Sequence, residues 1–227
     1  MAVTTTLDYN DLPALLTELT DDEKHDRSAL STLDVLWVLY DRVLRLDPRA
    51  AHDPERDRFL LSKGHGPAAY YAVLAAKGFV DVDRLAGFGT FDSPLGYHPD
   101  HLLIPGVEIS SGSLGHGLPI ALGTTLGLQA RGRSRPRVFC LVGDAELDEG
   151  SNWEAVQLAG RLGLGRLTAV VVDNHSSTYH WPGGIAARFE LEGWSAATVD
   201  GRDHDALERA LTTAGERPRA VVAEVRR

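Results

Sequence analysis

The chain contains very little sulfur and no long apolar run. Its 227 residues include one cysteine and one methionine, so an intramolecular disulfide is excluded and a reducing compartment is indicated. The cysteine, Cys140, lies within the apolar run VFCLV, where we expect a buried, unreactive thiol. No apolar run approaches the roughly 20 residues that cross a bilayer, and the N-terminus lacks the basic and apolar regions of a secretion signal. These features predict a cytoplasmic protein that does not enter a membrane.

The composition is acidic, with a formal net charge of −9. This charge argues against nucleic acid or an anionic membrane surface as the main partner, because a basic patch would have to overcome the overall field. Apolar residues make up 43% of the chain and charged residues 24%, which is typical of a soluble globular protein. No linker, internal repeat or low-complexity tract divides the chain. We therefore predict one domain over residues 1–227, with residues 1–19 as a peripheral arm containing a short helix at 12–19.

Apolar periodicity alternates between short strands and helices along the chain. Strands are predicted at residues 59–61, 138–142, 167–172, 197–199 and 220–225. Helices are predicted at residues 31–46, 68–76, 118–129, 153–162 and 203–213. This alternation predicts an α/β fold, with a doubly wound, mainly parallel sheet flanked by helices.

The most informative segment, residues 137–174, holds an acidic cluster between two apolar strands. Asp144 follows the first of these strands, and Asn174 follows the second. In an open parallel sheet, ligands bind where the carboxyl ends of the strands meet. One carboxylate and one amide oxygen, completed by a backbone carbonyl and phosphate oxygens, suit Mg²⁺. The simpler alternative for the acidic residues is stabilisation of a helix dipole, for which Asp148 and Glu149 suffice.

Three other segments carry residues suited to ligand binding. Glycines flank His65 in SKGHGP and let the backbone bring the imidazole up to a ligand, although a structural histidine is the commoner outcome. His98 lies in YHPD within a long loop, a type of segment that often carries function. The glycine-rich turn at residues 110–117 opens a helix, where backbone N–H groups can bind an anion. The four arginines between residues 131 and 137 are most simply a solvated loop, with phosphate binding as the alternative.

Several motifs occur together and in a fixed order. They are RDRFLLSKGH, GYHPD, ISSGSLGHGLPIALG, GDAELDEGSNWEA, Asn174 and GW…VDGRD. In order and approximate spacing this set resembles the N-terminal, diphosphate-binding domain of the transketolase family, over about residues 25–225. The resemblance implies the thiamine diphosphate-binding fold, with thiamine diphosphate and Mg²⁺ as cofactors. Each motif is weak alone, whereas their joint occurrence is specific.

The resemblance also implies roles for individual residues. Mg²⁺ would be coordinated by Asp144, Asn174 and the main-chain carbonyl of Ser176. The cofactor would be contacted by His65, Gly112, Ser113, Leu114, Gly143, Asp144, Ala145, Glu146 and Asn174. The catalytic set would bind sugar oxygens, transfer protons or link paired active sites, and comprises His25, His65, His98, His116, Glu149 and Glu154. Histidines suit both proton transfer near neutral pH and hydrogen bonds to polyols.

The chain departs from the family pattern at three places. Ala145 stands where the family more often has Gly, and His116 stands where Gln is usual. The family has a Pro-Gly turn after the residue that matches His25, whereas this chain reads HDRS there. A further departure is that no Lys-Gly-rich closing segment follows the last strand. Nothing in the sequence matches the family's pyrimidine-binding domain, whose Glu protonates the cofactor ring.

The resemblance therefore implies the N-terminal subunit of a split transketolase-like enzyme that acts on sugars or sugar phosphates. The expected partner is a C-terminal subunit with the pyrimidine-binding domain, in an α2β2 heterotetramer. Two alternatives stay open: a subunit of another thiamine diphosphate enzyme, of the 2-oxo acid dehydrogenase or carboligase type, and a non-catalytic regulatory subunit.

Overall fold

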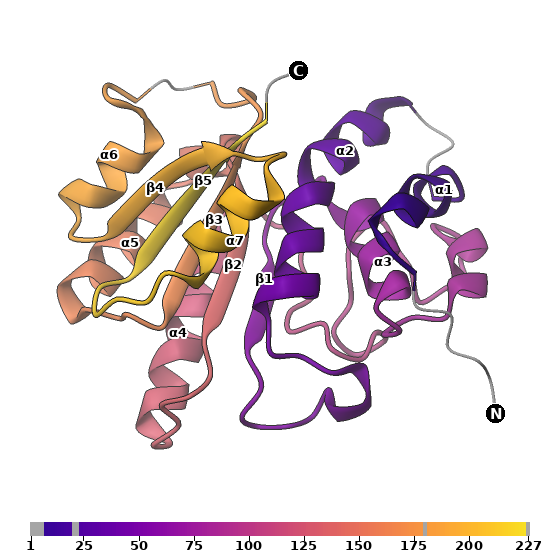
Figure 1. Cartoon of the computed structure of the whole chain (residues 1–227), viewed down its shortest axis with the longest axis horizontal. Coiled ribbons are helices and arrows are strands. Elements are labelled where there is room, and N and C mark those ends of the chain that lie inside the picture. Colours follow the sequence, from indigo (N-terminus) through magenta and orange to yellow (C-terminus); the bar gives the residue numbers. More distant parts are fainter. Residues whose placement is uncertain (1–6, 20–22, 179–180, 226–227) are drawn as a thin grey trace.

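The computed structural model describes residues 7–19, 23–178 and 181–225. For residues 23–28 it describes the backbone only. Its centre is a parallel sheet of five strands in the order β1-β2-β3-β5-β4 (Figure 1). The strands are β1 (Arg58–Leu61), β2 (Val138–Gly143), β3 (Leu167–Asp173), β4 (Ser195–Asp200) and β5 (Arg219–Glu224). All five lie where the apolar runs predict them, within about two residues.

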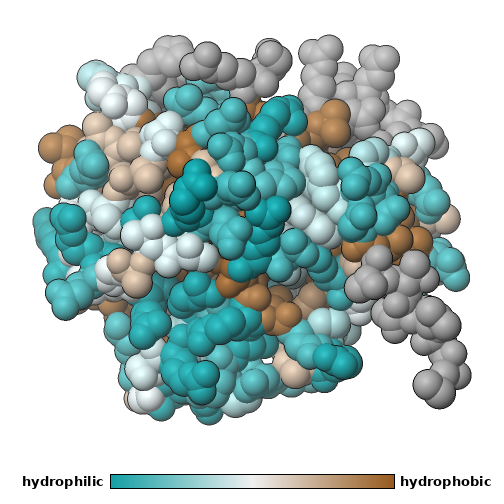
Figure 2. All heavy atoms as spheres, viewed as in Figure 1, coloured by the Kyte–Doolittle hydropathy of each residue, from teal (hydrophilic) through white to brown (hydrophobic). Residues whose placement is uncertain are grey.

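Helices cover both faces of the sheet, which confirms the predicted doubly wound α/β architecture. One face packs against α1 (Leu12–Thr17), α2 (Glu23–Val38), α3 (Pro67–Ala76) and α7 (His204–Thr212). The other face packs against α4 (Gly117–Ala130), α5 (Gly150–Leu162) and α6 (Gly184–Leu191). Among the described residues, no helix has the length and apolarity to span a bilayer. The surface in Figure 2 is mainly hydrophilic, with small separate apolar patches.

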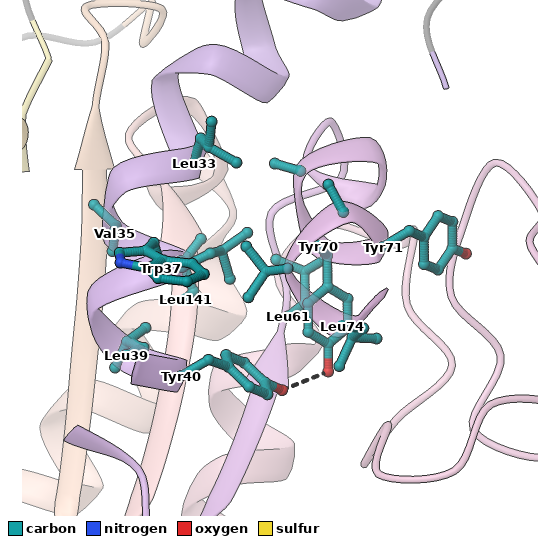
Figure 3. Packing of buried hydrophobic residues seen from close by; sticks show 14 of the residues in the cluster. Leu33, Val35, Trp37, Leu39, Tyr40, Leu61, Tyr70, Tyr71, Leu74 and Leu141 are labelled. Atoms are coloured by element: carbon teal, nitrogen blue, oxygen red, sulfur yellow. Dashed lines mark hydrogen bonds between the residues drawn. The ribbon is translucent and has the colours of Figure 1, made fainter. Parts of the chain in front are cut away.

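The two faces of each strand enter different cores, because alternate side chains point to opposite sides of a sheet. Phe139 and Leu141 of β2 join the core beneath α2 and α3, whereas Val138, Cys140 and Val142 join the core beneath α4 and α5. Figure 3 shows the first of these cores. Cys140 is fully buried, and burial raises the pKa of its thiol, as predicted for an unreactive cysteine.

The amino end of the sheet is held by a buried ion-pair cluster around Asp57, which precedes β1. Its carboxylate accepts hydrogen bonds from the backbone N–H and guanidinium of both Arg45 and Arg137. Burial raises the pKa of Asp57, but the hydrogen bonds from the two arginines outweigh burial and leave it lowered. Arg137 and Arg133, which pairs with Glu55, therefore contribute to structure rather than only to a solvated loop.

Two expectations differ from the structure. The segment predicted as a peripheral arm contributes four leucines to the core, all under 9% exposed: Leu12, Leu15, Leu16 and Leu19. The following helix begins at Glu23 rather than at residue 31 and continues after Val38 as a π-helical turn, Leu39–Val43. Its first turns are too polar (EKHDRS) to show an apolar stripe, so periodicity could not find them.

Candidate functional site

A cavity of about 760 Å³ opens at the carboxyl end of the sheet. It is lined by residues at or just after the carboxyl ends of all five strands, by Leu114 of the glycine-rich turn, and by the helix α2. Seven residues predicted from the sequence line it: His65, Leu114, Gly143, Ala145, Glu146, Asn174 and Ser176. The fold therefore brings segments that are far apart in the chain to one concave surface, where parallel sheets bind ligands.

Asp144 lies between the lining residues Gly143 and Ala145 and is 1% exposed. Its backbone N–H donates to the carbonyl of Val172 (3.0 Å), so the turn after β2 is joined to β3. Its carboxylate accepts hydrogen bonds from the Ser176 N–H (2.6 Å) and hydroxyl (2.6 Å) and from the Ser177 N–H (2.8 Å). A buried carboxylate thus fixes the loop that carries the other predicted metal ligands.

Asn174 provides the clearest indication of a missing ligand. Its side-chain oxygen Oδ1 is buried and has no hydrogen-bond partner among the described residues, as is also true of Asn152 Oδ1 and Trp181 Nε1, but of these three residues only Asn174 lines the cavity. The next residue, His175, adopts a left-handed conformation (φ 58°), which is uncommon outside glycine and concentrates at functional sites. A hard cation would satisfy the orphaned oxygen, and an amide oxygen beside a carboxylate suits Mg²⁺.

The donor set is small, as expected for a metal that shares its ligands with a diphosphate. Within the described ranges, no group of three His, Cys, Asp or Glu side chains could hold a metal by itself. Asp144 and Asn174 would hold Mg²⁺ from the protein side, with Ser176 next to them, and phosphate oxygens and water would complete its coordination. The residues present fit the ion.

Glu146 fastens three segments behind the cavity. Its buried carboxylate accepts hydrogen bonds from the Ser62 hydroxyl, the Gly115 N–H (3.0 Å) and the Gly143 N–H (3.3 Å). Burial raises its pKa, and these hydrogen bonds oppose the rise without cancelling it. The ends of β1 and β2 and the glycine-rich turn are thereby held together. Glu146 has a structural role beside any contact with the cofactor.

Lys63 is a cation that the sequence patterns did not indicate. It lines the cavity although its side chain is largely buried, and its stem passes over Gly143, where an added Cβ would lie 3.3 Å from Lys63 Cγ. Its ammonium donates to the His65 carbonyl (3.1 Å). Burial lowers the pKa of Lys63 to about 8, while Asp144 and Glu146 act to raise it. A cation beside two carboxylates helps to balance the charge of this surface.

The glycine-rich turn needs its glycines because other side chains pack directly against it. At Gly112 (φ 121°) an added Cβ would lie 2.7 Å from the His98 ring, and at Gly117 it would lie 2.3 Å from Ser62. The Gly117 N–H donates to the Ser62 hydroxyl (3.0 Å), which fixes the start of α4 to the end of β1. This turn therefore lies against both predicted histidine segments.

His65 and His98 come together at a second, smaller cavity. This cavity of about 130 Å³ shares Gly64 and His65 with the larger one and includes His98. Both imidazoles are exposed, so they can reach a ligand. The shared cavity brings the two predicted histidines to one place, and their catalytic roles stay predictions.

The remaining predicted residues lie away from the cavities. Ser113, His116, Glu149 and Glu154 are exposed and do not line either of them. Glu149 packs against Gly115, and Glu154 is an exposed residue of α5. His25 is in α2, but its side chain lies outside the described residues.

Comparison with known proteins places these features in a family. The model of the transketolase thiamine diphosphate-binding domain matches residues 19–226. The chain is 53% identical over 224 residues to a protein of Rhodococcoides fascians named ferredoxin fas2, covering 98% of this chain and 74% of that protein. It is 42% identical over 146 residues to a protein of Actinobacillus succinogenes that is named as one subunit of apulose-4-phosphate transketolase, covering 64% of this chain and 52% of that protein.

Solved transketolases share the fold. A transketolase variant from Pichia stipitis superposes with a TM-score of 0.80 at 25% identity, covering 96% of this chain and 36% of that one. Transketolase from Campylobacter jejuni gives a TM-score of 0.79, also at 25% identity, with 38% of its chain covered. This chain thus spans little more than a third of these enzymes. Sequence, fold and the arrangement of the cavity agree, and the chain belongs to the transketolase family, as its thiamine diphosphate-binding domain.

Proposed function

We propose that this chain is the N-terminal subunit of a heteromeric, thiamine diphosphate-dependent transketolase-like enzyme. The reaction is transfer of a two-carbon ketol unit from a ketose to an aldehyde acceptor. The observation that carries the proposal is the single cavity that gathers His65, the Gly143–Glu146 turn and Asn174 with its unpartnered oxygen. Relatives named as transketolase subunits, from Actinobacillus succinogenes and Clostridium, support one part of a split enzyme rather than a complete one.

The protein groups would act by binding and orientation. Thiamine diphosphate, when bound, would supply the nucleophilic carbon and the electron sink that transfer of a two-carbon unit requires. Asp144, Asn174 and Ser176 would hold Mg²⁺ at the diphosphate. His65 would approach the cofactor, and His98 would bind hydroxyl and carbonyl oxygens of the donor sugar; imidazoles suit both such hydrogen bonds and proton transfer near neutral pH. His25, His116, Glu149 and Glu154 complete the proposed catalytic set.

A partner protein would supply the surface for the reactive ring of the cofactor. We propose an α2β2 heterotetramer with a C-terminal transketolase-like chain that carries the pyrimidine-binding domain. The exposed positions of Glu149 and Glu154 leave both side chains accessible to that partner. Sugars or sugar phosphates are the proposed substrates, and the cytoplasm is the proposed location, because one cysteine suits a reducing compartment.

The test is reconstitution. The purified chain should show no ketol transfer from a ketose phosphate, and addition of the partner should produce it together with thiamine diphosphate and Mg²⁺ dependence. Turnover by the chain alone would refute the split enzyme. A complex that binds no thiamine diphosphate would instead support a non-catalytic regulatory role.

A second candidate is another thiamine diphosphate enzyme, such as one that oxidises 2-oxo acids. It is favoured by one observation, the name ferredoxin carried by the relative at 53% identity. Iron–sulfur clusters need several thiolate ligands, and this chain has only Cys140, so an electron acceptor would have to be a separate protein or domain. Reduction of an iron–sulfur protein by the complex with a 2-oxo acid, without ketol transfer, would select this candidate.

A further inference from the structure

Arg202 lines the large cavity, as Lys63 does, and takes no part in the proposed metal and sugar contacts. It lies in the turn between β4 and α7, and its side chain is 53% exposed. The cavity also contacts Ser31 of α2 and the proposed metal-site residues Asn174 and Ser176. Arg202 therefore brings a permanent positive charge to the wall formed by α2 and the β4–α7 turn.

The guanidinium is oriented by a buried carboxylate that already has closer partners. Asp34 of α2 accepts a hydrogen bond from the Tyr9 hydroxyl (2.6 Å) and lies 2.8 Å from His204 Nε2. Arg202 contacts the same carboxylate at a longer 3.4 Å. Asp34 can therefore orient Arg202 while its main interactions are made with Tyr9 and His204.

The donor capacity of Arg202 exceeds what the described residues use. A guanidinium carries five N–H donors in a planar fork, and within the described residues its side chain makes one contact, the long one to Asp34. That fork matches the oxygens of a phosphoryl group and binds them in bidentate fashion. An exposed arginine, oriented by a buried carboxylate and facing a cavity, is well suited to bind an anion.

We infer that Arg202 binds a phosphoryl group in the large cavity and so sets a preference for phosphorylated ligands. The inference rests on the proposed function for the identity of the ligand. Two sources share this chemistry: the diphosphate of the cofactor and the phosphate of a ketose phosphate. Arg202 would bind phosphoryl oxygens directly, whereas the metal-site residues would bind them through Mg²⁺.

Two variants test this role. Arg202→Gln removes the positive charge, whereas Arg202→Lys keeps the charge but loses the planar set of guanidinium N–H donors. Arg209→Gln is the matched control, because Arg209 is an exposed arginine on α7 outside the cavity and gives the same change in net charge. Calorimetry on the full chain would measure binding of inorganic diphosphate with Mg²⁺. On the complex with its partner, kcat/KM would be compared for a ketose phosphate and the same ketose without phosphate.

If the cofactor is the source, Arg202→Gln weakens diphosphate binding about 10-fold, as expected for a charge-assisted hydrogen bond, and Arg202→Lys restores part of it. If the substrate is the source, diphosphate binding is unchanged and the preference for the phosphorylated ketose falls about 10-fold. Unchanged values in both measurements, or equal losses in Arg209→Gln, would overturn the inference.

Failure of the proposed function is recognised separately. A wild-type complex that binds inorganic diphosphate in an Arg202-dependent way but shows no ketol transfer would refute the function and retain the anion site. A wild-type protein that binds neither diphosphate nor ketose phosphate would overturn the inference.

Discussion

The buried carboxylates Asp57 and Glu146, at opposite ends of the sheet, have pKa values shifted in opposite directions. At the amino end, Asp57 is saturated by two arginines, and its pKa is lowered. At the carboxyl end, Glu146 is buried with a raised pKa, and the Asn174 oxygen has no partner among the described residues. Among the described residues, the Asp57 carboxylate is satisfied by protein groups, whereas the Asn174 oxygen is left for the ligand that we propose at the carboxyl end.

The largest effect on stability is expected at the amino end. Asp57→Ala leaves two arginines without their buried partner and should lower the free energy of unfolding by about 3 kcal/mol. Glu55→Gln, which breaks a more exposed pair with Arg133 at the same end, should change it by less than about 1 kcal/mol. Urea denaturation measures both. Equal effects of the two variants would show that Asp57 is no stronger an anchor than a surface ion pair.

The next effect tests the packing behind the cavity. Gly117→Ala places a Cβ 2.3 Å from Ser62 and should lower the free energy of unfolding by about 1–3 kcal/mol, because Ser62 and the start of α4 must move apart. Gly123→Ala in the same helix meets no atom within 4 Å and should stabilise by about 0.5–1 kcal/mol. Opposite signs in denaturation are expected. A neutral Gly117→Ala would mean that this turn is not fixed by Ser62.

The pH dependence should also separate the two ends. The pKa of Asp57 is lowered in the folded state, so its stabilising contribution is present above the unfolded value of about 3.9 and is lost as the pH falls through the folded value. Glu146 has the opposite sign: its contribution is present below its unfolded pKa and is lost as the pH rises through the raised folded value. Unfolding measured from pH 6 to 2 should show a slope that Asp57→Asn reduces. An unchanged slope would remove Asp57 as its source.

The smallest effect on the protein alone is expected at Asn174. Asn174→Ala removes an oxygen that has no partner among the described residues and should change stability by about 0.5 kcal/mol or less. The control is Asn152→Ala: the Asn152 Oδ1 also has no partner among the described residues, but its side-chain N–H donates to the main-chain carbonyl of Glu146 (2.7 Å), so its loss should cost about 1–2 kcal/mol. A large loss at Asn174 without ligand would assign it a structural role instead.

Sequence patterns predicted the sheet well and the details of the site less well. The strands are short apolar runs rich in β-branched residues, so periodicity located all five. The resemblance to the transketolase family implied one site for His65, Gly143 and Asn174, and all three line the same cavity. The start of α2 was missed because its first turns are polar. Lys63 and Arg202 were missed because their importance depends on which turns line the cavity, and this is settled only by tertiary packing.

The most direct test of the cofactor site is thiamine diphosphate binding by the chain in complex with its partner, with and without Mg²⁺. We predict that wild type binds the cofactor only with Mg²⁺ and that Asp144→Ala weakens binding at least about 100-fold, since the carboxylate both holds the ion and fixes the Ser176 loop. Glu55→Gln, at the other end of the sheet, should bind as wild type does. Unchanged affinity in Asp144→Ala would contradict the assignment of the carboxyl end as the cofactor site.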